Sequence, residues 1–161
     1  MEFSNKFGQY RRTLLSYAEG RVLEMGFGTG ANLSYYNGPQ VTELVGVDWS
    51  EAMLIKAFGK LDDLKLEQEE SVALSRRGID VSKEAGVVGT TLPENIKLMR
   101  ADCLSLHALF PDDSFDCVVD TLTLNSVYNR ELLANEMKRV VRPGGRILLL
   151  ERGQSHLSVY N

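Results

Sequence analysis

The sequence predicts an α/β protein built on a doubly wound parallel sheet. Short apolar segments that fit buried strands alternate five times with helical segments, a pattern typical of parallel sheets covered on both faces. A glycine-rich turn directly follows the first of these strands, within the stretch "VLEMGFGTGANL" that starts at Val22. The 161 residues fit one domain, 1–161, and are enough to bury a core.

The predicted elements of the first half depend on clear start and stop signals. Apolar residues recur at helical spacing before Gly20, which ends the first helix. The breaker Asn37-Gly38-Pro39 ends the second helix, and Ser50 is a plausible N-cap for the third. In order, we expect a helix over 3–19, a strand over 21–27, a helix over 29–38, a strand over 42–48 that ends at Asp48, and a helix over 51–61.

A polar insert, 63–95, separates the two halves of the chain. Its first part fits a continuing charged helix, and its second part, rich in glycine, fits a loop. We expect the insert to be either disordered or a surface for a partner. The second half then predicts a strand over 96–102, a short helix and turn over 104–114, a strand over 115–127 that runs into a loop, a helix over 129–145 closed by Pro143-Gly144-Gly145, and a strand over 146–153.

Composition excludes several classes of function. The net charge of −4 gives no electrostatic reason to expect a nucleic acid or an anionic membrane as partner, and no apolar stretch is long enough to span a bilayer. Cys103 and Cys117 are too few for a disulfide scaffold and lack metal-ligand spacing. We therefore expect no metal, and free thiols in a reducing compartment, either cytoplasmic or mitochondrial.

The glycine-rich turn fits two kinds of ligand. The pattern G-x-G-x-x-A that starts at Gly26, with Asp48 about twenty residues on, satisfies the dinucleotide fingerprint of an NAD(P)-dependent oxidoreductase. Glu24, just before the first glycine, is unfavourable beside a pyrophosphate but suits a cationic ligand with a free amino group. Gly30 keeps side chains away over a longer arc, and Asp102, after the third strand, can reach an adenine amino group. These features favour a cationic adenosyl ligand.

An ordered set of motifs extends this interpretation. The chain contains E-x-G-x-G-x-G, V-D-W-S, A-D, F-P-D-D-S-F-D and R-P-G-G-R in that order. With them it resembles the class I S-adenosylmethionine-dependent methyltransferases, in particular the small-molecule branch of ubiquinone/menaquinone-biosynthesis enzymes and the methyltransferase-like proteins related to a yeast mitochondrial homologue. The resemblance implies a Rossmann-like fold. Because that fold ordinarily continues beyond strand 5 and this chain stops at Asn161, we expect a fold truncated there, without strands 6 and 7.

The resemblance also implies a cofactor, S-adenosyl-L-methionine, and a product, S-adenosyl-L-homocysteine. It implies that Glu24 contacts the methionine end, Asp48 the ribose hydroxyls and Asp102 the adenine amino group. The whole implied set is Tyr10, Glu24, Gly26, Phe27, Gly28, Thr29, Gly30, Asp48, Trp49, Met53, Asp102, Cys103, Asp120 and Thr121.

The expected reaction is methyl transfer to an oxygen, carbon or sulfur of a small molecule. The protein mainly has to align the acceptor and exclude water. Asp120, Asn125 and Tyr128, in the loop after the fourth strand, are the candidates for proton transfer. A non-catalytic cofactor-binding or assembly module and an NAD(P)-dependent oxidoreductase remain alternatives. The apolar strand 5, exposed at a sheet edge, predicts either a homodimer through that edge or poor solubility.

Overall fold

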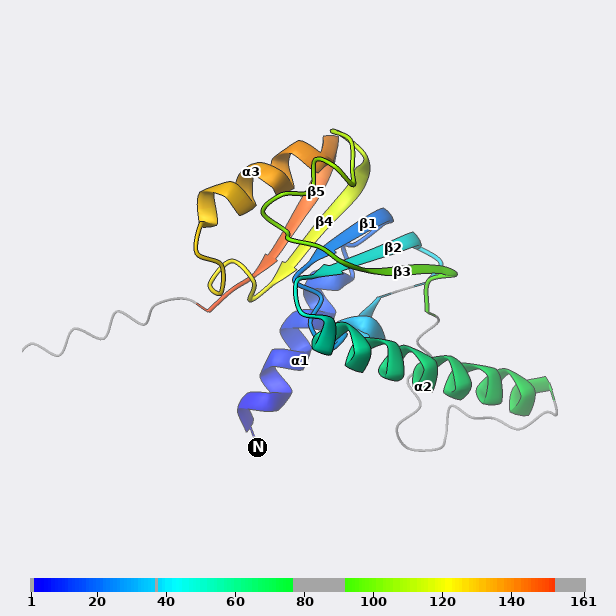
Figure 1. Cartoon of the computed structure of the whole chain (residues 1–161). Helices are drawn as coiled ribbons and strands as arrows, with labels where there is room; N and C mark the ends of the chain where they lie inside the picture. The colour runs from blue at the N-terminus through cyan, green and yellow to red at the C-terminus, as the bar shows by residue number, and fades with distance from the viewer. Residues whose placement is uncertain (1, 37, 77–91, 153–161) are drawn as a thin grey trace, which may run out of the picture.

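The computed structural model describes residues 2–36, 38–76 and 92–152. Its centre is a five-stranded sheet with the order β3-β2-β1-β4-β5, in which every neighbouring pair is parallel (Figure 1). The predicted α/β architecture is confirmed. The strands are β1 Gly20–Met25, β2 Val41–Asp48, β3 Asn95–Arg100, β4 Phe115–Thr121 and β5 Val141–Leu150. The helices are α1 Glu2–Leu15, the 3₁₀ turn η1 Leu33–Tyr35, α2 Glu51–Arg76 and α3 Arg130–Val140.

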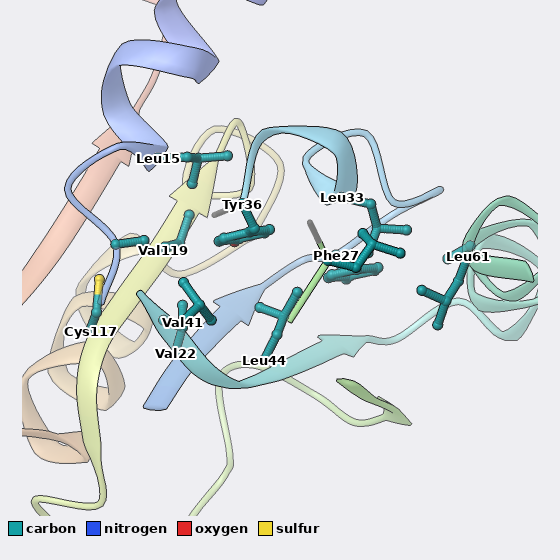
Figure 2. Close-up of a cluster of buried hydrophobic side chains, with 13 residues drawn as sticks. Leu15, Val22, Phe27, Leu33, Tyr36, Val41, Leu44, Leu61, Cys117 and Val119 are labelled. Carbon is teal, nitrogen blue, oxygen red and sulfur yellow. The ribbon is translucent and has the colours of Figure 1, made fainter. Parts of the chain in front are cut away.

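Helices cover both faces of the sheet. One buried cluster joins the sheet to α1, η1 and α2, and a second joins the opposite face to α3. Figure 2 shows the first cluster, in which the ring of Tyr36 lies among aliphatic side chains from β1, β2 and β4. Residues alternate between the two clusters along β1, with Val22 in one and Leu23 in the other, as expected for a strand buried on both faces.

The strand order reverses direction between β1 and β4. From β1 the chain adds β2 and β3 on one side, and then returns to add β4 and β5 on the other. In such sheets, ligands bind outside the carboxyl ends of the strands at this switch point. The carboxyl end of β1 leads directly into the glycine turn.

Several of the predicted helices were wrong in their extent. The first helix ends at Leu15, because Ser16 and Tyr17 close it with a tight turn in which Ser16 Oγ also bonds Thr13 O. Gly20 does not end this helix but starts β1 at a φ of +70°, where a Cβ atom would collide with the Asp116 carboxylate. Glycine is needed there for entry into the sheet.

The helix expected over 29–38 is reduced to η1, because Gly26, Gly28 and Gly30 all adopt positive φ. This leaves too few residues before Pro39 for an α-helix. The short helix expected over 104–114 is instead a series of turns.

The fourth and fifth strands also differ from prediction. β4 ends at Thr121, because Leu122 adopts a φ of +73° and leaves the extended conformation. β5 begins at Val141, so that the Pro-Gly-Gly segment lies within the strand, at a register shift opposite Phe115–Cys117, and does not close α3. Of the polar insert, 63–76 continues α2 as expected, and 77–91 lies outside the described residues.

The longest described helix, α2, carries charged residues along its length. In the described part of the chain, no helix combines the length and the apolar character needed to cross a membrane.

Candidate functional site

A cavity of about 810 Å³ opens at the carboxyl ends of the strands. This volume is in the range of small-molecule and cofactor sites. One wall comes from the segments that follow β1, β2 and β3: Gly26, Gly28, Asp48, Trp49, Ser50, Met53, Asp102, Cys103 and Leu104. The other wall comes from the end of β4 and the loop after it: Thr121, Leu122, Thr123, Ser126, Val127 and Tyr128.

The glycine turn leaves room for a ligand at one position in particular. A Cβ atom built on Gly28 would have no neighbour closer than 3.9 Å, so this backbone faces open space. At Gly26, by contrast, a Cβ atom would lie 2.0 Å from Thr123 Oγ1. Gly26 is therefore needed for the contact between the turn and the loop after β4, whereas Gly28 keeps the cavity open.

Asp48 connects the end of β2 to the glycine turn. Its Oδ2 accepts a hydrogen bond of 2.7 Å from Gly28 N, and its Oδ1 accepts one of 2.8 Å from Ser50 N. The carboxylate therefore fixes the turn and the start of α2 while it lines the cavity. Trp49 and Met53 project from the same region and are 69% and 41% exposed, so that they form the rim of the cavity.

The segment that carries Asp102 is held from outside by α3. Asp102 Oδ1 accepts a hydrogen bond of 2.9 Å from Leu104 N. Glu136 of α3 accepts one of 2.8 Å from Leu106 N, and Arg139 donates one of 2.9 Å to Phe110 O. The mutual ion pair of Glu136 and Arg139 fixes this arrangement and lowers the pKa of Glu136.

Asp120, at the end of β4, is a buried structural acceptor. It is fully buried, and its two carboxylate oxygens accept hydrogen bonds from Thr123 N (2.8 Å) and Leu124 N (3.0 Å). Burial raises its pKa above the ordinary value. The next residue, Thr121, lines the cavity, whereas Asp120 does not.

The other two candidates for proton transfer differ from each other in their surroundings. The amide of Asn125 donates to the Glu151 carboxylate and does not line the cavity. Tyr128 lines the cavity and is 85% exposed. Of the three residues predicted in this loop, the structure therefore brings Tyr128 alone to the cavity wall.

Glu24 points into the protein interior. Its side chain is 1% exposed and accepts hydrogen bonds from Tyr36 Oη (2.6 Å) and Asn32 Nδ2 (2.9 Å). Burial has the larger effect on the pKa of Glu24 and raises it to about 7, whereas the two hydrogen bonds lower this pKa. Glu24 does not line the cavity. A direct contact with a ligand ammonium group, as expected from the motif, does not fit this geometry.

The remaining predicted residues divide into two groups. Gly26, Gly28, Asp48, Trp49, Met53, Asp102, Cys103 and Thr121 lie together in the cavity wall, whereas Tyr10, Phe27, Thr29 and Gly30 do not. Phe27 is a core residue whose ring packs against Gly46, and Tyr10 is 57% exposed on α1.

Six residues of the cavity wall were not predicted from the sequence, and four of them, Leu122, Thr123, Ser126 and Val127, share a signal. They belong to the loop that follows a predicted strand at the ligand-binding edge. The other two, Ser50 and Leu104, adjoin predicted residues.

Neither cysteine is activated. Burial raises the pKa of both the Cys103 and the Cys117 thiols to about 11, so that both are neutral at pH 7. Within residues 2–36, 38–76 and 92–152, no cluster of three or more His, Cys, Asp or Glu side chains could hold a metal ion.

Comparison with known proteins shows what the chain is similar to. Residues 23–149 match the family model described as a methyltransferase domain. The chain is 30% identical over 131 residues to a phosphatidylethanolamine N-methyltransferase from Cereibacter sphaeroides. This match covers 81% of this chain and 50% of that protein. It is 33% identical over 135 residues to the ubiquinone/menaquinone biosynthesis C-methyltransferase UbiE from Geobacter sulfurreducens, which covers 82% of this chain and 41% of that protein.

Solved structures share the fold. The YcgJ protein from Bacillus subtilis superposes with a TM-score of 0.58 at 25% identity, over 92% of this chain and 50% of that one. An S-adenosylmethionine-dependent methyltransferase from Mesorhizobium loti superposes with a TM-score of 0.57, over 88% of this chain and 51% of that one, at 24% identity. The chain spans about half the length of the curated relatives it matches. On its sequence, its sheet and its glycine turn together, the chain belongs to the class I S-adenosylmethionine-dependent methyltransferases.

Proposed function

We propose that the protein binds S-adenosylmethionine in the cavity and transfers its methyl group to a small, largely apolar acceptor. One observation carries this proposal. A single cavity connects the acids and the open glycine backbone after β1, β2 and β3 to the loop after β4. A cofactor bound along the first wall would therefore present its reactive end to an acceptor held against the second.

The first wall fits the cofactor chemically. The Asp48 and Asp102 carboxylates can accept hydrogen bonds from a ribose diol and an adenine amino group, and both are favourable near a cation. Gly28 leaves open the space that a side chain would fill. Trp49 and Met53 offer apolar surface for a base. When bound, the cofactor supplies an activated methyl group, so the protein has to align the acceptor and exclude water.

The second wall favours an apolar acceptor. Leu122 and Val127 are aliphatic, and Tyr128 adds an exposed ring. Several of the relatives are ubiquinone/menaquinone C-methyltransferases. We therefore infer that the acceptor is a quinol-like aromatic ring that is methylated at carbon. With Asp120 and Asn125 both engaged in hydrogen bonds, Tyr128 is the remaining one of the three predicted candidates for proton transfer.

A second candidate is a cofactor-binding or assembly module without turnover. The observation that favours it is that Asp120 and Asn125 are both engaged in hydrogen bonds away from the cavity, and that no carboxylate of the described loop after β4 lines the cavity. The two candidates share cofactor binding and differ in product formation.

Calorimetry followed by a transfer assay tests the proposal. We expect S-adenosylmethionine and S-adenosylhomocysteine to bind in the micromolar range and NADH not to bind. With radiolabelled cofactor and a demethylquinol, we expect the label to enter the organic phase. Cofactor binding without transfer to quinols, phenols, thiols or amines would favour the module. Absence of cofactor binding to folded protein would overturn both candidates.

We also propose that β5 mediates a homodimer. Among the described residues β5 pairs with β4 alone, and no described strand pairs with its other edge. Ile147 and Leu149 of this strand are 36% and 47% exposed. Exposed apolar edge strands tend to pair with another chain.

A further inference from the structure

A buried polar cluster lies directly behind the cavity wall. Glu24, Asn32 and Tyr36 are each at most 1% exposed. The amide nitrogen of Asn32 lies 2.9 Å from Glu24 Oε1 and 3.0 Å from Thr121 Oγ1. Thr121 lines the cavity and Glu24 does not. Asn32 is therefore a direct bridge between a buried carboxyl group and the hydroxyl group of a residue that lines the cavity.

The bridge does not satisfy Asn32 completely. Its Oδ1 is buried and has no hydrogen-bond partner among the described residues. An asparagine amide has two donor hydrogens on nitrogen and an acceptor oxygen of similar shape. Rotation of this amide would place Oδ1 between Glu24 and Thr121 and leave the nitrogen unpartnered. Each orientation leaves one atom unsatisfied, so the proton on Glu24 decides between them.

The two orientations give Thr121 opposite roles. With Glu24 ionised, Asn32 Nδ2 donates to both Glu24 and Thr121, and the Thr121 O–H can donate into the cavity. With Glu24 protonated by solvent, the Glu24 O–H donates to Asn32 Oδ1, and Thr121 donates to the same oxygen. The free lone pairs of Thr121 then face the cavity.

We propose that Asn32 is a positioning residue that transmits the protonation state of Glu24 to the hydroxyl group of Thr121 in the cavity wall. The coupling itself is a property of the free protein. Its effect on ligands rests on the proposed function, because it requires that the cofactor or acceptor contact Thr121.

The surroundings of Glu24 place this change in the neutral range. Burial raises its pKa to about 7, while the hydrogen bonds from Tyr36 and Asn32 and the charge of Arg11 lower it, and Asp120 raises it. Burial lowers the pKa of Lys60 of α2, and its interaction with the charge of Glu24 opposes this shift. These groups come from α1, α2, β4 and the segment around η1. Variants must therefore separate Glu24 from Asp120, whose pKa is also raised.

The first experiment measures the coupling without any ligand. In free protein with ¹³C-methyl-labelled threonine, we expect the Thr121 methyl resonance to titrate near pH 7. A Glu24→Gln variant keeps a hydrogen-bonding group in place and should abolish this titration, and Asn32→Leu should abolish it as well. Titration that persists with wild-type amplitude in Asn32→Leu overturns the proposal, as does a wild-type resonance that does not titrate.

If Asn32→Leu does not fold, a second variant, Tyr36→Phe, tests the same coupling. Tyr36→Phe keeps the bridge but removes a hydrogen bond that lowers the Glu24 pKa. The midpoint of the Thr121 titration should then move to higher pH. An unchanged midpoint contradicts the proposal.

The second experiment measures the effect on ligands. The ratio of the dissociation constants of S-adenosylmethionine and S-adenosylhomocysteine should change about three- to tenfold between pH 6 and pH 8, as one altered hydrogen bond would give. Thr121→Val should remove the change and Thr121→Ser should retain it. A Thr121→Val variant that keeps the full change would show that the charge of Glu24 acts without the bridge. Absence of cofactor binding would contradict the proposed function and leave the first experiment decisive.

Discussion

The backbone N–H of Gly28 donates a 2.7 Å hydrogen bond to Asp48 Oδ2 and thereby closes the turn after β1 with the carboxylate at the end of β2. Phe27 N also bonds Val47 O, so the turn continues the pairing of the two strands. The residue expected to hold the cofactor ribose is therefore also the residue that shapes the glycine turn.

Replacement of Asp48 by alanine should damage both functions. It leaves the N–H groups of Gly28 and Ser50 without their acceptor, which should cost about 1–3 kcal/mol of unfolding free energy. Cofactor affinity, measured by calorimetry, should fall more than about tenfold. Asp63→Ala removes an exposed acid from α2 and is the matched control. Unchanged affinity in folded Asp48→Ala would contradict the assigned role.

Alanine substitutions in the glycine turn should separate folding from binding. Gly28→Ala adds a methyl group into open space at a φ of +58°, so it should cost about 1–2 kcal/mol but abolish cofactor binding. Gly26→Ala places its methyl group against Thr123. This collision should lower the free energy of unfolding by about 1–3 kcal/mol beyond the cost of the positive φ. Gly59→Ala, in α2 with nothing nearby, should stabilise by about 0.5–1 kcal/mol. Chemical denaturation and calorimetry measure both effects.

Glu24 should make the stability depend on pH. Its folded pKa, about 7, lies above its ordinary value of 4.5, so the folded state binds the proton more tightly. The associated stabilisation is complete below the unfolded pKa and is lost as pH rises through 7, at about 1.4 kcal/mol per pH unit between the two values. Denaturation of wild type and Glu24→Gln at pH 5, 6, 7 and 8 isolates this contribution, because all other groups are shared. Parallel pH profiles would show that Glu24 titrates normally.

Tyr128 and Asn125 should differ in their effect on turnover. If Tyr128 moves the acceptor proton, Tyr128→Phe should lower kcat about a hundredfold with little change in cofactor affinity. Asn125→Ala removes an exposed bond to Glu151 and should change kcat less than about twofold. Steady-state kinetics with the demethylquinol decides, and equal losses in the two variants would argue against a specific role for Tyr128.

A charge on the exposed edge strand should dissociate the proposed dimer. Leu149→Lys places a lysine on β5, and Leu132→Lys places one at a comparably exposed site on α3, which is 42% exposed. Light scattering after size exclusion should show a dimer for wild type and Leu132→Lys, and a monomer for Leu149→Lys. A monomeric wild type at all concentrations would exclude this interface.

The sequence predicted the centre of the sheet well because β1, β2 and β4 are buried on both faces. Segments such as β2 and β4 must then be almost continuously apolar, and the polar residue at the end of each marks the ligand-binding edge. The same marks placed Asp48 and Asp102 in the cavity wall. The glycine pattern alone left a dinucleotide open, and family membership resolved that ambiguity.

Features that depend on distant partners were not predictable. Glu24 resembled a ligand-binding acid because nothing near it in the sequence reveals that the Tyr36 hydroxyl, twelve residues on, would bond it in the core. Asn125 resembled a catalytic amide because its partner, Glu151, lies beyond the next helix and strand. In both cases tertiary hydrogen bonds, rather than local pattern, decided where the side chain points.

The hydrogen bonds that join α3 to the segment after β3 have a consequence for divergence among relatives. Glu136 and Arg139 hold the backbone next to Asp102 although neither side chain touches the cavity. Substitutions on an outer helix can therefore shift the wall that contains Asp102, and change the affinity for the proposed cofactor, while every residue in that wall stays the same. Two homologues with identical cavity linings could thus differ in how tightly they retain their product.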